Sequence, residues 1–557
     1  MDRVPVSVVL GLIGGLLAVG VAGPASGAKS AERPNFLIVL ADDLGYSDIG
    51  AYGGEIETPH LDKLAQNGLR YTDFYNTGRC WPTRTALLTG YYYHQVRGGA
   101  GWANLLPDYL KPLGYRAYHS GKWHVHMADK AVGDGGFDRS YRINDHNRFF
   151  YPKDHRLDGK QLPPVTPEDD FYLTTEIASR AVDFLGQHQK QHDDRPWLMY
   201  LAFTAPHFPL HAPQSDIAKY DGTYDAGWDV IRRRRLKRMK QIGIVADDVK
   251  LPPRQPEVVP DWNMWAKRLA DQLPSKEQRR DDWRRKSLTE VYGPGEVGAA
   301  VSWDSLSPAE QTFQAKKMQI HAAMVDRMDR EIGRVLDQIK NLGERKNTVV
   351  VFLSDNGASA ELIVRGDGHD REAPMGSGKS YLCLGPGWST ASNTPMRLHK
   401  SWVHEGGAAT PFIVNWPAGL KPSDEGKLRT TPGHVIDLLP TMLDLAGGDH
   451  TRQSASEPPL PGKSLVPSFN EDGSIERDEL FLLHDGNRGL RLGDWKLVSR
   501  RGNNQWQLYN LAEDRNELND LADERPGKLN QMKKRWHTLK RRFNQQNKGN
   551  WQKPVEP

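Results

Sequence analysis

A cysteine and an arginine four residues apart could supply this chain with a nucleophile beside a positive charge. Cys80 and Arg84 enclose the tripeptide Trp-Pro-Thr. Residues 83–88 have the pattern of a helix with Pro82 in its first turn, where a missing N–H costs little. We expect Cys80 just before this helix, where free N–H groups and the helix dipole favour negative charge. Arg84, one turn further on, would face the same side, so the pair suits attack on an anionic substrate.

Cys80 has two other interpretations. It could be a small buried hydrophobic residue, or half of a disulfide with Cys383, the other cysteine of the chain. A bridge would consume the nucleophile, so the disulfide and catalytic interpretations exclude each other. Two cysteines in 557 residues do not make a disulfide scaffold, and we expect Cys383 to be buried.

Four oxygen-bearing side chains follow two expected strands. One apolar run leads into Asp42 and Asp43, and a second leads into Asp355 and Asn356. Ligands of open α/β sheets bind beyond the carboxyl ends of strands, and three carboxylates gathered there would repel one another unless a cation held them. All-oxygen ligands indicate Ca²⁺ or Mg²⁺ rather than zinc. The alternative is that the first pair caps a loop and the second belongs to a turn.

Two lysines and two histidines also lie near expected strands. Lys122 and His124 follow a short strand-like segment, within the sequence Gly-Lys-Trp-His, and His207 follows the apolar run at residues 198–203. Lys400 lies five residues before a Glu-Gly-Gly segment that precedes another apolar run. Taken alone, a histidine such as His207 is more often a structural loop residue.

Together these segments resemble the type I sulfatases, in which the cysteine of a C-x-P-x-R signature is oxidised to formylglycine. The similarity includes the small and apolar continuation at residues 85–90, the first metal-binding segment at residues 34–45 and the G-K-W-H segment at residues 121–124. Residues 386–395 are most similar to the arylsulfatase branch, and the likeness extends to residues 493–497. Where the family often continues G-K-W-H with Leu-Gly, this chain has Val-His, so His126 is assigned no role.

The resemblance implies a nucleophile and a metal site. Formylglycine made from Cys80 would be the nucleophile and would complete the shell of one metal ion, usually Ca²⁺. The other metal ligands would be Asp42, Asp43, Asp355 and Asn356.

The resemblance also implies roles for the remaining polar side chains. Arg84 would favour the ionised nucleophile, and Lys122 and Lys400 would bind the sulfate group. His124 would contact the formylglycine, and His207 would protonate the leaving oxygen.

The implied reaction is hydrolysis of a sulfate monoester to an alcohol or phenol and sulfate. The partners would be a sulfated small molecule or carbohydrate and the machinery that generates formylglycine. One alternative is a phosphoester or phosphonate hydrolase on the same scaffold, although a site with one metal and no second His/Asp set favours sulfate. The other alternative is an exported binding protein that has lost catalysis, and an unconverted Cys80 would support it.

Positioning these residues requires an α/β fold. Short apolar runs alternate with helical patterns, which predicts a large, mostly parallel sheet sandwiched by helices, of alkaline-phosphatase-like type. The sulfatase catalytic domain is expected at residues 33–450, with a charged insertion at about 221–301. A smaller α+β domain is expected at residues 476–557, where strand-like segments precede a helix with one apolar face.

The bulk composition is that of a soluble globular protein. Hydrophobic residues make up 38% and charged residues 26% of the chain, and the formal net charge is +4. This mild excess is compatible with an anionic substrate and does not indicate nucleic acid. The basic run at residues 232–238 could be a nucleic-acid patch or a solvated helix face, and we favour the solvated face.

The N-terminus predicts export. Arg3 precedes an apolar run at residues 6–22 and small residues up to Ala28, which is typical of a signal peptide spanning residues 1–28. The mature protein would be periplasmic or secreted, with no stable membrane association. The alternative is an uncleaved membrane anchor, although the run is short for a span and contains several glycines.

Overall fold

The computed structural model describes Met1 and residues 33–549, except 98–99, 126–130, 134, 256–287, 450–456 and 503–504. Residues 2–28 of the expected signal peptide, His126 and the middle of the charged insertion lie outside the described residues. The signal peptide and the limits of the two expected domains therefore stay predictions. Among the described residues, no helix combines the length and the apolar character that a membrane span needs.

A large mixed sheet forms the centre of the fold. The order of its described strands is β11-β2-β10-β9-β1-β8-β4-β5-β6-β7. The central strands run parallel to one another. They are β1 (Asn35–Ala41), β4 (Arg116–Lys122), β5 (Arg139–Ile143), β8 (Trp197–Ala202) and β9 (Thr348–Ser354). Burial on both faces explains the continuous apolar sequences of β1, β8 and β9.

Antiparallel pairs extend the sheet on both sides. β10 (Phe412–Asn415) pairs antiparallel with β9 and with β2 (Leu69–Tyr71), which is followed by β11 (Leu428–Arg429). β6 (His155–Leu157) and β7 (Lys160–Gln161) complete the other side. The predicted mostly parallel sheet is therefore confirmed, with antiparallel pairs on both sides of its centre and a parallel pair of β11 with β2 at one edge.

The apolar and aromatic run at residues 69–75 has the sequence pattern of one strand, but the structure divides it. Two short strands form instead, β2 and β3 (Phe74–Tyr75), and β3 leaves the large sheet to pair with β12 (Gly433–His434). The break falls at Asp73, whose carboxylate forms ion pairs with Arg491 and Arg515. Neither arginine can be inferred from the local apolar pattern.

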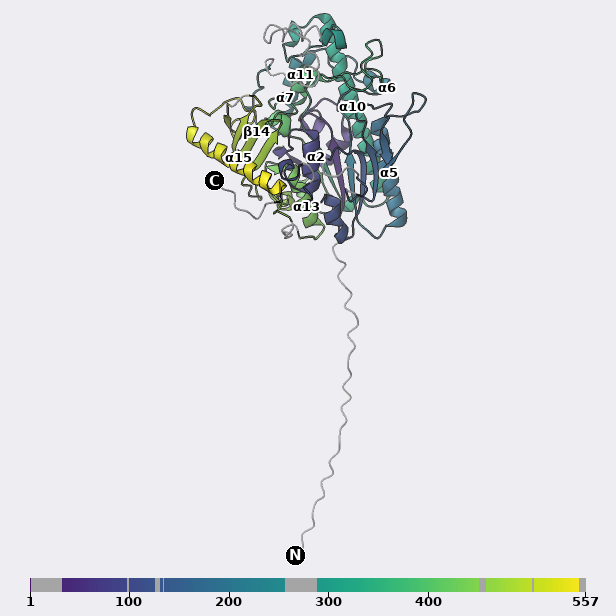
Figure 1. The fold of residues 1–557 in the computed structure, drawn as a ribbon, viewed down its shortest axis with the longest axis vertical. Coiled ribbons are helices and arrows are strands. Elements are labelled where there is room, and N and C mark those ends of the chain that lie inside the picture. The colour runs from purple at the N-terminus through teal and green to yellow at the C-terminus, as the bar shows by residue number, and fades with distance from the viewer. Residues whose placement is uncertain are drawn as a thin grey trace. The chain divides into compact units, whose positions relative to one another are not determined.

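Helices cover both faces of the sheet, as predicted (Figure 1). One face packs against α1 (Pro59–Gln66), α5 (Leu173–Gln191) and the long α10 (Pro308–Asn341), whose capping box at Ser307 and Glu310 is present. The other face packs against α2 (Cys80–Thr89), α4 (Leu106–Leu110) and α13 (Leu438–Leu445). The remaining α-helices used below or drawn in Figure 1 are α3 (Tyr93–Val96), α6 (Gln214–Ala218), α7 (Gly227–Gln241), α11 (Gly385–Ser392), α12 (Glu405–Ala408) and α14 (Val466–Asn470).

A small antiparallel sheet and a long helix follow near the C-terminus, as predicted. The sheet comprises β13 (Leu480–His484), β14 (Asn487–Leu492), β15 (Trp495–Ser499) and β16 (Gln507–Asn510). The helix α15 (Pro526–Asn547), drawn in yellow, buries one apolar face that includes Trp536 and Phe543. A buried ion pair of Lys496 in β15 with Glu405 in α12, 2.5 Å, joins this sheet to the segment that follows Lys400.

The basic run at residues 232–238 lies in α7 and is only partly solvated. Arg233 and Arg234 are exposed, whereas Arg232 and Arg235 are buried. Arg235 forms ion pairs of 2.7 Å with Asp48 and with Glu55. The expectation of a solvated face is therefore wrong for Arg232 and Arg235, because the helix turns them toward the interior.

Candidate active site

Cys80 is the first residue of α2 and is 3% exposed. The expectation that it precedes the helix is off by one position, because Arg79, in an extended conformation, is the N-cap. Burial raises the pKa of the Cys80 thiol, although Lys122 and Lys400 act in the opposite direction. An unmodified thiol here is therefore neutral and a poor nucleophile. Both cysteines are free and buried, so the disulfide interpretation is wrong and Cys383 is buried as expected.

Arg84 lies one turn after Cys80 and is completely buried. Its Nε and Nη2 atoms both lie 2.8 Å from Oδ2 of Asp355, and Nη1 donates to the carbonyl oxygen of Lys122 at 2.9 Å. The guanidinium therefore ties the start of α2 to the ends of β4 and β9. Two nitrogen atoms of one guanidinium that contact the same carboxylate fix the orientation of the arginine side chain and also balance its charge.

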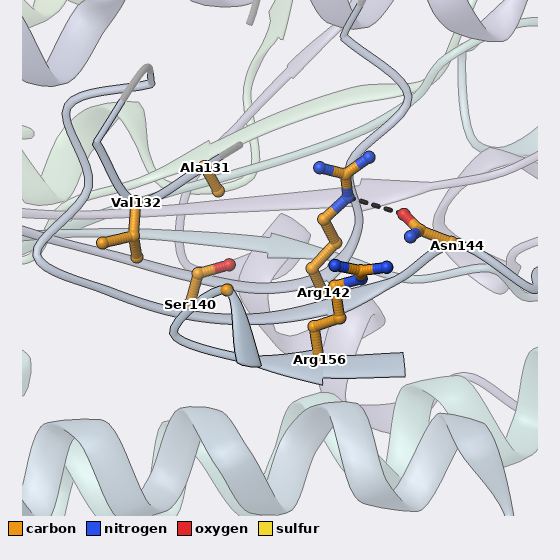
Figure 2. Close-up of a pocket in the computed structure, with 7 residues that line it drawn as sticks. Ala131, Val132, Ser140, Arg142, Asn144 and Arg156 are labelled. Carbon is orange, nitrogen blue, oxygen red and sulfur yellow. Dashed lines mark hydrogen bonds between the residues drawn. The ribbon is translucent and has the colours of Figure 1, made fainter. Parts of the chain in front are cut away.

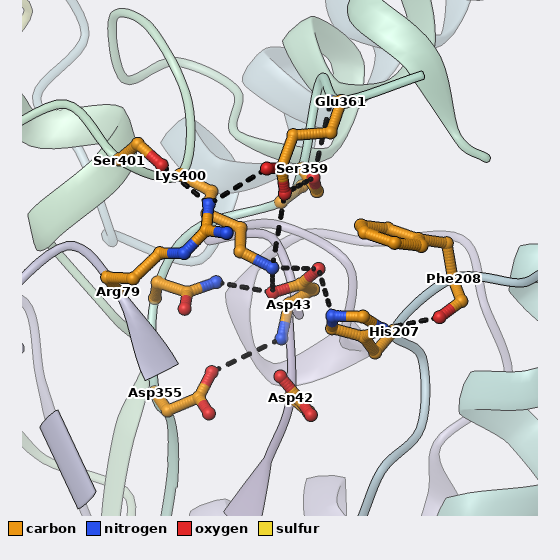
Figure 3. A network of polar contacts seen from close by, with 12 residues as sticks. Asp42, Asp43, Arg79, His207, Phe208, Asp355, Ser359, Glu361, Lys400 and Ser401 are labelled. Atoms are coloured by element: carbon orange, nitrogen blue, oxygen red, sulfur yellow. Dashed lines mark hydrogen bonds and ion pairs between the residues drawn. The ribbon is translucent and has the colours of Figure 1, made fainter. Parts of the chain in front are cut away.

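The four candidate metal ligands meet beyond two adjacent parallel strands, as expected. Ala41 is in register with Ser354, so the next residues, Asp42 and Asp355, lie side by side. Asp43 adopts a left-handed conformation with φ of 67°, which turns its side chain toward Asn356. The Asn356 amide donates to Oδ1 of Asp43 at 2.7 Å (Figure 3).

The donor set fits a hard divalent cation. Ligand atoms of Asp42, Cys80 and Asp355 all lie within 4.8 Å of one another. Oδ1 of Asp42 and Oδ1 of Asn356 are buried and have no hydrogen-bond partner among the described residues. Unsatisfied buried oxygens are costly, and a cation between them would remove that cost. The oxygen donors of Asp42, Asp43, Asp355 and Asn356 suit Ca²⁺ or Mg²⁺ better than zinc.

The three aspartates are buried close together, and this shifts the pKa of each carboxyl group. Burial raises the pKa of Asp355, and the neighbouring Asp42 adds to the effect. Burial also raises the pKa of Asp43, against the charge of Lys400. For Asp42, burial is outweighed by the charges of Lys122 and Arg84, which hold its pKa below the usual value. Further positive charge is needed to keep all three carboxylates ionised.

Both candidate sulfate-binding lysines are buried at this edge. Lys122, the last residue of β4, forms an ion pair with the Asp42 carboxylate. Lys400 lies with Nζ 2.7 Å from Oδ1 of Asp43 and 3.5 Å from Oε2 of Glu361 (Figure 3). Both ammonium groups therefore face the carboxylate cluster beside Cys80.

The two candidate histidines lie in a row with a third. The ring of His124 stacks on that of His146 at 5.7 Å, and the ring of His146 lies 5.4 Å from that of His207. Nε2 of His207 lies 3.8 Å from Oδ2 of Asp43. Burial, together with the charges of Lys400 and Lys122, lowers the pKa of His207 well below its usual value. Negative charge from a bound anion would act in the opposite direction.

Sequence reasoning missed four polar residues around this cluster, which are Arg79, His146, Glu361 and Ser401. His146 carries no motif, and only its place after a strand, like that of His124 after β4, could have indicated it. Arg79 forms an ion pair with Glu361, 3.0 Å, and donates to Oγ of Ser401 at 2.7 Å. Glu361 and Ser401 are far from Arg79 in the chain, so no local sequence pattern predicts these contacts.

Comparisons with known proteins agree with this geometry. The Sulfatase family model matches residues 34–448. An uncharacterized sulfatase of Schizosaccharomyces pombe is 32% identical, covering 91% of this chain and 94% of that protein. An arylsulfatase of Klebsiella aerogenes is 31% identical, covering 78% of this chain and 92% of that protein.

Solved structures share the fold at lower identity. Ps i-CgsB, solved in complex with k-i-k-neocarrahexaose, superposes with a TM-score of 0.62 at 22% identity, covering 93% of this chain and 94% of that one. The phosphonate monoester hydrolase SpPMH from Silicibacter pomeroyi superposes with a TM-score of 0.54 at 18% identity, covering 91% and 95%.

The layered sheet, with its polar cluster beyond the strand ends, defines an alkaline-phosphatase-like α/β fold. Within that class, the family match and the two relatives above 30% identity decide the family. This chain belongs to the sulfatase family and is a sulfuric ester hydrolase.

Proposed function

We propose that this chain hydrolyses sulfate monoesters with a formylglycine made from Cys80 and one bound Ca²⁺ ion. The observation that carries the proposal is the position of Cys80. Cys80 is the first residue of α2. Its sulfur lies within 4.8 Å of a carboxylate oxygen of Asp42 and of a carboxylate oxygen of Asp355. No other described feature explains why a cysteine, an arginine and three carboxylates share one buried edge.

Asp42, Asp43, Asp355 and Asn356 are the residues that would hold the calcium ion. Bound there, the ion would supply Lewis-acid stabilisation of charge on the sulfate oxygens. It would also balance the carboxylates that Lys122 and Lys400 now neutralise. The ammonium groups of both lysines could then turn toward an anionic substrate.

The other side chains have separate tasks in the proposed reaction. Lys122 and Lys400 bind the sulfate oxygens and stabilise charge that shifts onto them. Arg84 holds the start of α2 in place and disfavours a proton on the nucleophile. His207 gives a proton to the leaving oxygen, and His124 assists at position 80. The hydrated formylglycine would supply one hydroxyl for attack and a second for release of sulfate.

The substrate of this proposal is a sulfated small molecule or carbohydrate. Among more distant relatives, one at 24% identity is named N-acetylglucosamine-6-O-sulfatase, from Bacteroides thetaiotaomicron. The competing activity is hydrolysis of phosphate or phosphonate esters on the same fold. Phosphate monoesters carry nearly two negative charges where sulfate monoesters carry one. A site with a single metal suits the lower charge.

Turnover of matched aryl esters tests the proposal. Purified calcium-loaded protein is assayed with 4-nitrophenyl sulfate, 4-nitrophenyl phosphate and a 4-nitrophenyl phosphonate ester. We expect the highest kcat/KM for the sulfate. A higher kcat/KM for the phosphonate would assign the chain to the competing activity, and binding without turnover by formylglycine-containing protein would support the inactive binding protein.

We also propose that the chain is exported and loses residues 1–28. The charged start, apolar run and small residues support this. N-terminal sequencing of the protein from its native source should find a new terminus near Ala28. Retention of Met1 on membrane-bound protein would contradict export as a soluble enzyme.

A further inference from the structure

Arg365 is a positively charged residue at the edge of the candidate active site, and the reaction described above gives it no role. It lies in the segment that follows β9. Its guanidinium carbon is 5.5 Å from the centre of the Phe208 ring. Phe208 follows the proposed general acid His207, and the centres of these two rings are 4.1 Å apart. Arg365 therefore contacts the same aromatic ring as the proposed general acid.

The Phe208 ring also places Arg365 near a lysine that is proposed to bind the reacting sulfate. Nζ of Lys400 lies 5.3 Å from the centre of this ring, and Figure 3 shows the ring beside Lys400 and His207. The two distances to the ring centre, added together, limit the separation of the Lys400 ammonium and the Arg365 guanidinium carbon to 10.8 Å. A substrate of one or two sugar rings could therefore contact both cations.

The Arg365 guanidinium has hydrogen-bond donors that the described part of the chain does not use. Its Nε atom is buried and has no hydrogen-bond partner there, and the guanidinium forms no ion pair with a described carboxylate. Glu361, four residues earlier, is engaged by other cations, because Arg79 lies 3.0 Å and Lys400 3.5 Å from its carboxylate oxygens. The charge of Glu361 therefore acts on Arg365 at longer range. A buried donor without an acceptor costs free energy, and an oxyanion of the substrate would remove that cost.

The loop after β5 lies against the segment that carries Arg365. Arg148 in this loop forms an ion pair of 2.9 Å with Asp367, two residues beyond Arg365. His146 belongs to the same loop, which leaves β5 at Asn144 (Figure 2). Burial lowers the pKa of His146 well below its usual value, and the charge of Arg365 acts in the same direction. The positive charge of Arg365 therefore reaches the row of histidines in the candidate active site.

We propose that Arg365 binds a second anionic group, a carboxylate or a sulfate, on the alcohol part of the substrate whose reacting sulfate lies at position 80. A guanidinium binds the oxygens of either group in a planar fork. The preferred substrate is then a saccharide with a second negative charge rather than a simple aryl sulfate. This inference rests on the proposed sulfatase activity, because it assumes a sulfate ester at position 80.

Binding measured without turnover tests Arg365 separately from the activity. Calcium-loaded protein with Cys80→Ala is titrated calorimetrically with monosulfated mono- and disaccharides, and with counterparts that carry one further sulfate or one carboxylate. We expect at least one doubly charged ligand to bind roughly tenfold more tightly, or better, than its singly charged counterpart. Adding Arg365→Gln should remove that advantage, because glutamine lacks the charge and the planar fork. The proposal is wrong if no doubly charged ligand gains affinity.

Two further variants separate recognition from a general loss of charge or fold. Arg371→Gln removes an exposed arginine of the same segment, which donates to the carbonyl oxygen of Thr289, and it should keep the full advantage. Arg365→Lys keeps the charge but loses the planar fork, so part of the advantage should remain. Thermal unfolding shows that each variant is folded. Equal loss of the advantage in Arg371→Gln would overturn the proposal. Equal falls in affinity of Arg365→Gln for both ligands of a pair would assign Arg365 a structural role beside Phe208.

Turnover with Cys80 unchanged separates this proposal from the proposed function. In Arg365→Gln, kcat/KM for a doubly charged saccharide should fall roughly tenfold more than kcat/KM for 4-nitrophenyl sulfate. Equal falls would overturn the role of Arg365 and leave the sulfatase activity intact. If inorganic sulfate binds in an Arg365-dependent manner while no saccharide gains affinity, Arg365 binds free oxyanions and the proposal is wrong. Absence of all sulfate ester turnover would overturn the proposed function, whereas the calorimetric comparison would still decide whether Arg365 recognises a second charge.

Discussion

The buried oxygens of Asp42 and Asn356 are the residue-scale features that most directly require a cation. Both lack hydrogen-bond partners among the described residues, and burial of Asp43 and Asp355 disfavours their charged forms. A carboxylate cluster of this kind is unstable alone because each added negative charge raises the pKa of the others. The metal site and the stability of this edge of the sheet should therefore change together.

Asp355→Asn should remove calcium binding and activity together. The substitution keeps the shape of the side chain but loses a ligand charge and a partner of Arg84. We expect calcium affinity to fall by roughly 100-fold or more. Calcium at 100 times its Kd should stabilise the wild type by about 2.7 kcal/mol and this variant far less, measured by thermal unfolding with calcium or a chelator. Asp367→Asn, at a largely exposed carboxylate, is the control.

Elemental analysis of the active wild-type protein completes this test. We expect calcium in a one-to-one ratio to protein. Stoichiometric zinc without calcium in fully active protein would contradict the assigned ligand chemistry.

His207→Gln should affect substrates according to their leaving groups. A general acid contributes roughly 10²–10⁴ in rate where the leaving oxygen needs a proton. The loss should therefore be large for an alkyl sulfate and much smaller for 4-nitrophenyl sulfate, whose leaving group is stable as an anion. His211→Gln alters another buried histidine of the same loop, which contacts the Ser380 carbonyl, and should affect both esters equally. Equal losses for His207→Gln would assign His207 a structural role.

At the scale of elements, the sequence predicted those strands and helices whose formation depends on residues close together in the chain. The apolar runs of β1, β8 and β9 are determined by near neighbours, and they form as expected. The strand ends also brought Asp42 and Asp355 together, because parallel register follows from the fold class.

Contacts between distant elements were not predictable in this way. The split of β2 from β3 depends on arginines more than 400 residues away, and the Arg79–Glu361 pair joins separate loops. In α7 the residues of the basic run look alike in sequence. Nevertheless Arg232 and Arg235 are buried, whereas Arg233 and Arg234 are exposed. Ion pairs between residues far apart in the chain produce no periodic pattern, so a single sequence does not predict them.

Arg235→Met should therefore behave unlike its neighbours in α7. It would leave Asp48 buried without its arginine partner, at a cost of about 3–5 kcal/mol in the free energy of unfolding. Arg234→Met, at an exposed position of the same run, should change that free energy by no more than about 0.5 kcal/mol. Urea unfolding of both variants measures the difference. Similar small effects would show that α7 is not anchored by Arg235.

At the scale of the whole molecule, buried neutral histidines should make the fold sensitive to acid. Burial lowers the pKa of His119, His399 and His434 to about 3 and that of His94 and His211 to about 4. In the unfolded chain each has a pKa of about 6.5. The folded state thus binds fewer protons, so its stability is complete above about pH 6.5 and falls as the pH drops toward these values.

His434→Asn tests this on a side chain that has no role in the proposed reaction. Asparagine can still accept from the backbone N–H of Ile436, as the Nδ1 atom of His434 does. Between pH 6 and 4.5 the slope of unfolding free energy against pH should decrease by about 1.4 kcal/mol per pH unit. An unchanged slope in His434→Asn would show that this histidine does not contribute.

The central claim is that Cys80 becomes the nucleophile by oxidation to formylglycine, and peptide mass spectrometry of active protein tests it most directly. The account predicts a peptide in which position 80 is lighter than cysteine, because one oxygen replaces sulfur and two hydrogens, and a fraction of modified protein that tracks specific activity. Cys80→Ala should then be folded and inactive toward aryl sulfates. Fully active protein with an unmodified thiol at position 80, or Cys80→Ala protein that hydrolyses aryl sulfates at the wild-type rate, would contradict the account.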